Sequence, residues 1–239
     1  IRGPVGTRVV LSLKRKGQDP IQVTLQRRQI HVRSATSKML ADKVGYIRIR
    51  FFGEDTGAEF QQAAKQVIDQ GARALVLDVR NNGGGYVKAS LDVVANFVDK
   101  GSLVVSVVNH RVERNESHRA DRSGQMRLPL VVLVNRFSAS ASEITAGALK
   151  DLGVATLVGE TTFGKASVQS LHELSDGGAL KYTIAHYLTP SGRDIHRQGI
   201  EPGIQLEAEP SNKLGGQEDT QLKAALNHLR KQMAGTPPG

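Results

Sequence analysis

The chain has 239 residues, 39% of them apolar and 4% aromatic, with no cysteine and no tryptophan. This composition suits an aliphatic α/β core and excludes disulfides, thiol catalysis and cysteine metal sites. The net charge of +9 does not predict nucleic-acid binding, because a surplus of eight lies in residues 1–40, where no aromatic-studded basic strand could stack bases. A solvated strand face, an acidic protein or a membrane surface explains this surplus better. No apolar run approaches the roughly 18 residues that span a bilayer.

The pattern of the first 28 residues predicts that they form the C-terminal part of a domain whose beginning is absent. Two short β-branched runs, at residues 7–13 and 21–25, flank a polar turn in a pattern typical of a hairpin. Because two strands alone are marginally stable in water, we expect residue 1 to be a cut within a longer chain.

Strands and helices alternate after this hairpin. A charged loop is predicted at 110–127, and beyond Pro202 we expect a polar linker and an amphipathic helix at 220–233. Helices are predicted at 56–70 and after the segments 80–85 and 137–140. The alternation is typical of one mostly parallel sheet covered by helices. Its expected strands are 44–52, 74–79, 103–108, 130–134, 155–158, 167–174 and 180–188.

Ser140 and Lys165 are the candidate chemical pair. Ser140 and Glu143 match a Ser-x-x-Glu capping box, so Ser140 could simply cap a helix. The same position suits a nucleophile, because the N–H of Ala141 would point to where an oxyanion forms. A serine hydroxyl needs a base, and Lys165 could serve if burial favours its uncharged form. The simpler alternative is a surface lysine in a loop.

Three consecutive glycines follow the strand predicted at 74–79. They lack the Gly-Lys-Ser/Thr ending and the Gly-x-Gly-x-x-Gly spacing of nucleotide-binding loops. They could supply a second oxyanion donor opposite Ala141, although a tight turn that requires positive φ would also explain one or two of them. The seven histidines have no metal-binding spacing, so we expect no metal site, whereas a Ser-His-Asp triad stays open.

Six motifs stand in a fixed order: GYIRI at 45–49, DVRNNGGG at 78–85, VNRFSASASEI at 134–144, GALKD at 147–151, GETTFGK at 159–165 and TPSGR at 189–193. Together they closely resemble those of the C-terminal processing peptidases, also called tail-specific proteases. The resemblance runs from about residue 1 to 204. It implies an α/β fold, with a crotonase/Clp-peptidase-like core of mixed sheets and helices preceded by the C-terminal remnant of a PDZ domain.

The resemblance also implies a division of the chain into three parts. These are the end of a PDZ domain at 1–28, a Ser/Lys peptidase core at 29–208, and a linker with an amphipathic helix at 209–239. PDZ domains hold C-terminal tails by strand addition and carboxylate capture. Two departures are visible, since Gly83 replaces a usual proline and Gly203 stands where aspartate is common.

Residue by residue, the resemblance implies that Ser140 is the nucleophile, that Lys165 is the general base and that Gln169 orients the lysine. The N–H of Ala141 and that of Gly84 or Gly85 would form the oxyanion hole. Asp151 matches a position implicated in some members of the family. We expect a structural role for Asp151, because a carboxylate beside Lys165 would favour the charged lysine and oppose its action as a base.

The predicted activity is that of a serine endopeptidase that cleaves near the C-termini of extracytoplasmic proteins through an acyl-enzyme, without a cofactor. The resemblance implies a location in the periplasm, the cell envelope or the thylakoid lumen. The expected partners are proteins or peptides with exposed C-terminal tails, and not nucleic acid; membrane-surface association and a homo-oligomer stay open. The rival hypotheses are a non-catalytic binding module on the same fold and a crotonase-type acyl-CoA enzyme, which has no use for a Ser/Lys pair.

Overall fold

The computed structural model describes residues 1–109, 115–175, 177–207 and 214–235. The chain divides into two compact units, Ile1–Arg33 and Ser34–Gly239. Residues 110–114 of the predicted charged loop and residues 209–213 of the predicted linker lie outside the described residues. In the part of the chain that is described, no helix has the length and apolar character needed to cross a membrane.

The first unit is an antiparallel hairpin of β1 (Arg8–Leu13) and β2 (Ile21–Gln26), which confirms the predicted pair of strands. Arg27 closes its open end, because its amide donates to the Thr7 carbonyl at 2.8 Å and its carbonyl accepts from Gly6 at 2.9 Å. Apolar side chains such as that of Val10 remain exposed. A two-stranded ribbon has no second layer against which to bury them.

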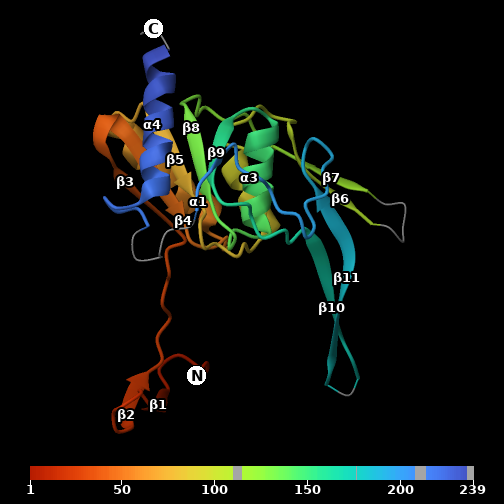
Figure 1. Cartoon of the computed structure of the whole chain (residues 1–239). Coiled ribbons are helices and arrows are strands. Elements are labelled where there is room, and N and C mark those ends of the chain that lie inside the picture. Colours follow the sequence, from red (N-terminus) through yellow and green to blue (C-terminus); the bar gives the residue numbers. More distant parts are fainter. Residues whose placement is uncertain (110–114, 176, 208–213, 236–239) are drawn as a thin grey trace. The chain divides into compact units, whose positions relative to one another are not determined.

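The second unit is built on a six-stranded sheet in the order β12-β9-β8-β5-β4-β3 (Figure 1). Every neighbouring pair is parallel except β3 and β4. The central strands are continuous apolar runs, which is typical of strands that are buried on both faces. The strands are β3 (Ala35–Met39), β4 (Val44–Ile49), β5 (Ala74–Asp78), β8 (Leu130–Val134), β9 (Ala155–Gly159) and β12 (Ile204–Gln205).

Helices cover both faces of this sheet. Helices α1 (Thr56–Asp69), α2 (Val87–Val94) and α3 (Ala141–Asp151) share one hydrophobic cluster with it, and α4 (Thr220–Gly235) packs on the opposite face (Figure 1). Alternate residues of each strand point to opposite faces. The strand residues in the cluster with α4 are Val44, Tyr46, Ala74, Val76, Val131, Leu133 and Val158. Those clustered with α1 to α3 include Ile47, Ile49, Leu75, Leu77, Val132 and Val134.

The expectation of a single, mostly parallel sheet is wrong for three of the predicted strands. They form a separate antiparallel sheet in the order β10-β11-β6-β7. Its strands are β6 (Leu103–Val108), β7 (Glu116–Arg119), β10 (Ser167–Glu173) and β11 (Ala179–Leu188). The segment between β10 and β11 is too short for the crossover of a dozen or more residues that parallel strands need. Strand β7 also occupies part of the predicted charged loop, and β3 and β12 were not predicted.

Candidate active site

Three loops meet at the carboxyl edge of the six-stranded sheet. The glycine loop follows β5, the serine run follows β8, and the segment with Lys165 follows β9. Strands β5, β8 and β9 are consecutive parallel neighbours, so their carboxyl ends lie side by side. This edge is where ligands bind in open parallel sheets. The fold therefore brings the three predicted catalytic segments together.

Ser140 occupies a strained turn between β8 and α3. Its φ of 56° and ψ of −117° are unusual for a residue with a side chain, and such strain concentrates at functional sites. The predicted capping box forms. The Glu143 carboxylate accepts the Ser140 N–H at 3.0 Å, and the Ser140 side chain faces the Glu143 N–H in return. The Ser140 side chain nevertheless stays partly accessible, so the cap position is compatible with a nucleophile.

The two flanking serines have structural partners. Ser138 donates its hydroxyl to the Val79 carbonyl at 2.8 Å, and Ser142 donates to the Asn82 carbonyl at 2.9 Å. Both side chains are fully buried, whereas Ser140 is half-buried. Of the three serines, Ser140 alone is partly accessible.

The glycine loop packs directly against Ser140. A Cβ placed on Gly84 would lie 2.7 Å from the Ser140 Cβ and 2.9 Å from the Ala141 nitrogen, and Gly84 has a φ of 98°. Gly85, at φ 147°, is equally restricted, because its Cβ would lie 2.0 Å from the Phe52 carbonyl oxygen. Both positions require glycine on steric grounds and by backbone conformation.

The amides of this region differ in availability. The Gly84 N–H donates to the Asn82 Oδ1 at 2.9 Å and is therefore occupied. The N–H groups of Ala141 and Gly85 have no acceptor within the ranges that the structure describes. Ala141 begins α3, where free N–H groups and the helix dipole favour negative charge. Of the two predicted glycine donors, Gly85 is the one with a free amide.

Glu143 joins the nucleophile turn to the segment that carries Lys165. Its Oε2 accepts the Ser140 N–H at 3.0 Å and the Lys165 N–H at 2.9 Å. Its Oε1 accepts the Thr162 hydroxyl at 2.5 Å and the Gly164 N–H at 2.7 Å. The residue is fully buried. Because Oε2 is shared, the two amide nitrogens lie within about 6 Å of each other. The capping-box match was the signal for Glu143, but it did not reveal these further contacts.

The side chains of Lys165 and Gln169 are both exposed. Gln169 lies in β10 opposite Thr183, directly after an irregularity in the strand register. The structure thus fixes the backbone of Lys165 beside the nucleophile turn, yet it does not bury the ammonium group. Burial is what would favour the uncharged lysine that a general base requires.

Asp151 lies at the end of α3 and binds the turn that follows β11. Its Oδ2 accepts the N–H of Ser191 at 3.1 Å and the hydroxyl of Ser191 at 2.6 Å, and Arg193 lies 3.8 Å from Oδ1. Burial opposes ionisation of this carboxyl, but hydrogen bonds from Ser191 and Thr189 and the charge of Arg193 hold its pKa below the ordinary value. These contacts are the kind expected of a structural residue.

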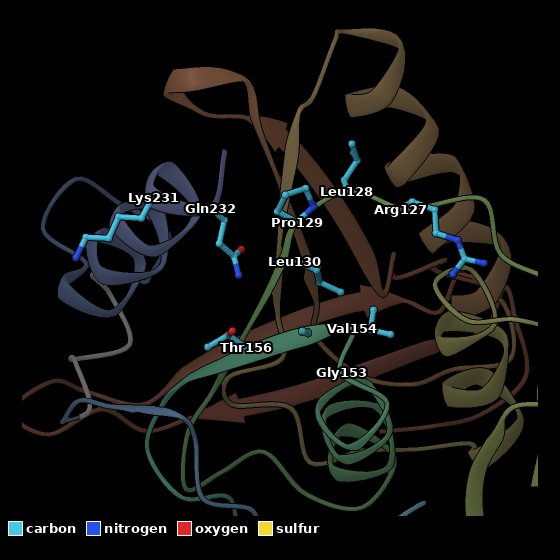
Figure 2. A pocket seen from close by; sticks show the side chains of 10 residues that line it. Arg127, Leu128, Pro129, Leu130, Gly153, Val154, Thr156, Lys231 and Gln232 are labelled. Atoms are coloured by element: carbon cyan, nitrogen blue, oxygen red, sulfur yellow. The ribbon is translucent and has the colours of Figure 1, made fainter. Parts of the chain in front are cut away.

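A groove of about 770 Å³ lies at the opposite edge of the sheet, where β8 and β9 begin (Figure 2). Its lining includes Arg127, Val154 and Lys231, but no predicted catalytic residue. Arg127 and Lys231 point away from each other in Figure 2, so their charges do not converge on a ligand. Across the described part of the chain, no three His, Asp or Glu side chains are grouped to hold a metal. The three predicted catalytic segments lie at the other, carboxyl edge of the sheet.

Comparison with known proteins identifies the family of the chain. The family model "Peptidase family S41" matches residues 43–206. The chain is 40% identical to the carboxyl-terminal-processing protease of Synechocystis sp. over 96% of its own length and 55% of that protein, and 37% identical to the carboxy-terminal processing protease CtpA of Bacillus subtilis over 90% and 46%. The chain thus spans about half the length of these curated relatives.

Solved structures extend the comparison. The photosystem II D1 C-terminal processing protease matches with a TM-score of 0.67 and 36% identity, over 86% of this chain and 57% of that one. A putative S41 protease from Bacteroides fragilis matches with a TM-score of 0.70 at 18% identity, over 94% of this chain and 65% of that one, which shows the fold alone. The predicted resemblance and α/β fold class are confirmed, and the chain belongs to peptidase family S41.

Proposed function

We propose that this chain carries the catalytic part of a serine endopeptidase that processes or degrades proteins from near their C-termini. One observation supports this above all others. Ser140, with its partly accessible side chain on a strained turn, and Lys165 donate their backbone N–H groups to the same oxygen of Glu143. The base-bearing segment is thus fixed to the nucleophile turn by a buried carboxylate.

In the proposed reaction, the Ser140 Oγ attacks the scissile carbonyl carbon while the uncharged Lys165 Nζ takes the hydroxyl proton. The carbonyl oxygen becomes an oxyanion that the N–H groups of Ala141 and Gly85 stabilise. Lys165 then gives its proton to the leaving amine, and the C–N bond breaks to leave an acyl-enzyme. Water, deprotonated by Lys165, releases the acyl product and restores the Ser140 hydroxyl.

The exposure of Lys165 gives the bound substrate a role in this mechanism. A peptide lying over the carboxyl edge of the sheet would exclude water from the ammonium group and favour its uncharged form. Gln169, on the strand that follows Lys165, would then orient the amine by hydrogen bonding. The lysine becomes a base only when substrate covers it.

The substrate class is proposed from the relatives. Their names describe carboxyl-terminal processing, and one describes processing of the photosystem II D1 protein. We propose substrates with exposed C-terminal tails and an extracytoplasmic location for this chain as well, with residues 1–28 as the C-terminal part of a tail-binding PDZ domain.

Digestion of an unfolded protein with an exposed C-terminal tail tests the proposal. The unmodified chain should cleave it, and Ser140→Ala and Lys165→Ala should each lose that cleavage. Lys65→Ala is the matched control, because Lys65 is an exposed lysine on α1 that forms only an i,i+4 pair with Asp69. A serine-directed fluorophosphonate should label Ser140, and mass spectrometry identifies the modified residue. Undiminished cleavage by both site variants would eliminate the Ser140/Lys165 dyad, whereas no cleavage and no labelling in the unmodified chain would favour a non-catalytic binding module.

A further inference from the structure

A buried charged cluster lies at the end of β5, directly before the glycine loop. Arg80 is at its centre, with a side chain that has no exposed surface. Its guanidinium group uses all five donors. Nε and one Nη bind Asp78, at 3.0 and 2.6 Å; the two Nη atoms bind the carboxylate of Asp219 at 2.9 and 2.7 Å; and one Nη also binds the Gln221 Oε1 at 2.9 Å.

Three of these five hydrogen bonds go to residues from the far end of the chain. Asp219 precedes α4, where it accepts the N–H of Leu222 at 2.9 Å and that of Gly215 at 2.7 Å. Gln221 lies in the first turn of α4 and donates to the carbonyls of Leu206 and Glu207. Asp219 and Gln221 are buried. The start of α4 is therefore anchored by a buried ion pair between Asp219 and Arg80. Packing of the apolar face of a helix on a sheet does not require such an ion pair.

The other side of the cluster leads to the nucleophile. Arg80 is followed by Asn81, which exchanges hydrogen bonds with Asn135 at 3.0 and 2.7 Å, and by Asn82. The Asn82 carbonyl accepts the Ala139 N–H at 3.0 Å, and its Oδ1 holds the Gly84 N–H. Residues 81–84 thus follow directly on the buried Arg80, and their hydrogen bonds connect them to the segment that carries the serine run.

We propose that Asp219 and Gln221 are positioning residues for the oxyanion loop. They fix the Arg80 guanidinium and thereby the path of residues 81–85 against Ser140 and Ala141, so that docking of the start of α4 is a condition for catalysis. This inference rests on the proposed function where it concerns catalysis, but the coupling between Asp219 and the loop stands independently of any activity.

A contribution to overall stability is the competing explanation, and a matched variant separates the two. Asp219→Asn keeps the shape of the side chain but replaces one acceptor with an amide donor that faces Arg80. Leu229→Ala leaves a cavity in the same helix, because Leu229 is fully buried against the sheet in the cluster with α4, about two helical turns beyond Gln221. Gln221→Leu removes one acceptor with little change of volume and serves if Asp219→Asn does not fold.

The experiment measures backbone hydrogen exchange of residues 81–86, kcat and KM in the full chain, at a temperature where every variant is folded. Asp219→Asn should speed exchange of the Gly84 amide about 10-fold and lower kcat about 10- to 100-fold with little change in KM, since small misplacements of oxyanion donors cost rates of this size. Leu229→Ala should lower Tm but change neither the exchange rate of the Gly84 amide nor kcat. Gln221→Leu should also speed exchange of the Gly84 amide and lower kcat, but by smaller factors than Asp219→Asn.

Equal exchange rates and equal kcat in Asp219→Asn and the unmodified chain would overturn the inference, as would an identical loss in Leu229→Ala. Failure of the proposed function has a different signature. In that case the unmodified chain would not cleave any tailed substrate, while faster exchange at residues 81–86 in Asp219→Asn would still establish the coupling.

Discussion

Glu143 accepts the backbone N–H of Lys165 at 2.9 Å, so the first turn of α3 holds the segment that carries the proposed base. The same carboxylate accepts three other donors, and all four come from the nucleophile turn or from residues 162–165. A buried carboxylate that is satisfied in this way acts as a rigid link, because losing it would leave several donors unpaired.

Glu143→Gln should therefore weaken both stability and catalysis. The amide has one acceptor oxygen in place of two, and its NH₂ group would face N–H donors. We expect a loss of about 1–3 kcal/mol in the free energy of unfolding and a fall in kcat of at least about 10-fold. Urea unfolding and steady-state kinetics measure the two effects. Glu160→Gln is the control, because among the described residues the Glu160 carboxylate makes only long contacts with Arg136; an equal effect in both variants would contradict the linking role.

Gly84→Ala should inactivate the enzyme, whereas Gly83→Ala should not. The new Cβ at Gly84 would lie 2.7 Å from the Ser140 Cβ at a φ of 98°, so the glycine loop would have to move away from the nucleophile. A Cβ at Gly83 meets nothing within 4 Å. The expected cost at Gly84 is about 1–3 kcal/mol of stability together with loss of cleavage. Full activity of Gly84→Ala would show that the loop is not confined by Ser140.

The parallel core could be predicted from the sequence because β5 and β8 are continuous apolar runs. Such runs are typical of strands that are buried on both faces, and their loops then lie at one edge. The antiparallel sheet was assigned wrongly because β10 and β11 also contain apolar and β-branched residues, and residue type alone does not give strand direction. The short connection between β10 and β11 allows only an antiparallel pair. Strand β12 has two residues, which is too few for any period to be recognised.

The site divides in a similar way between what the sequence indicates and what only the fold provides. Ser140 and the glycine loop belong to motifs at strand-to-helix turns, so their meeting could be expected. Three of the four hydrogen bonds of Glu143 come from backbone amides. Every residue except proline has such an amide, so residue type cannot predict these contacts. The exposure of Lys165 and the positive φ of Ser140 depend on neighbours in space, so the motif that predicts a dyad cannot predict whether the lysine is buried.

Ser140→Gly should be at least as stable as Ser140→Ala, although both should be inactive. In the middle of a helix or strand glycine is the less stable residue, because it loses more backbone freedom on folding. Here a φ of 56° with a ψ of −117° penalises any side chain, by about 1–3 kcal/mol. Urea unfolding of the two variants measures the difference. If Ser140→Gly were less stable by about 1 kcal/mol, the turn would not be strained in solution.

Asp151 should contribute stability that depends on pH. Its pKa in the folded chain is lowered, so the unfolded chain takes up a proton first as the pH falls. The contribution is fully present above the ordinary aspartate pKa of about 4 and is lost as the pH falls through the lower folded value. Asp151→Asn should therefore be less stable than the unmodified chain at pH 7, and the gap should narrow below about pH 4. Urea unfolding at both pH values measures it. Asp121→Asn, at an exposed carboxylate beside Arg122, is the control and should show little difference at either pH. A gap for Asp151→Asn that is unchanged with pH would mean that the Ser191 and Arg193 contacts do not favour the ionised carboxylate.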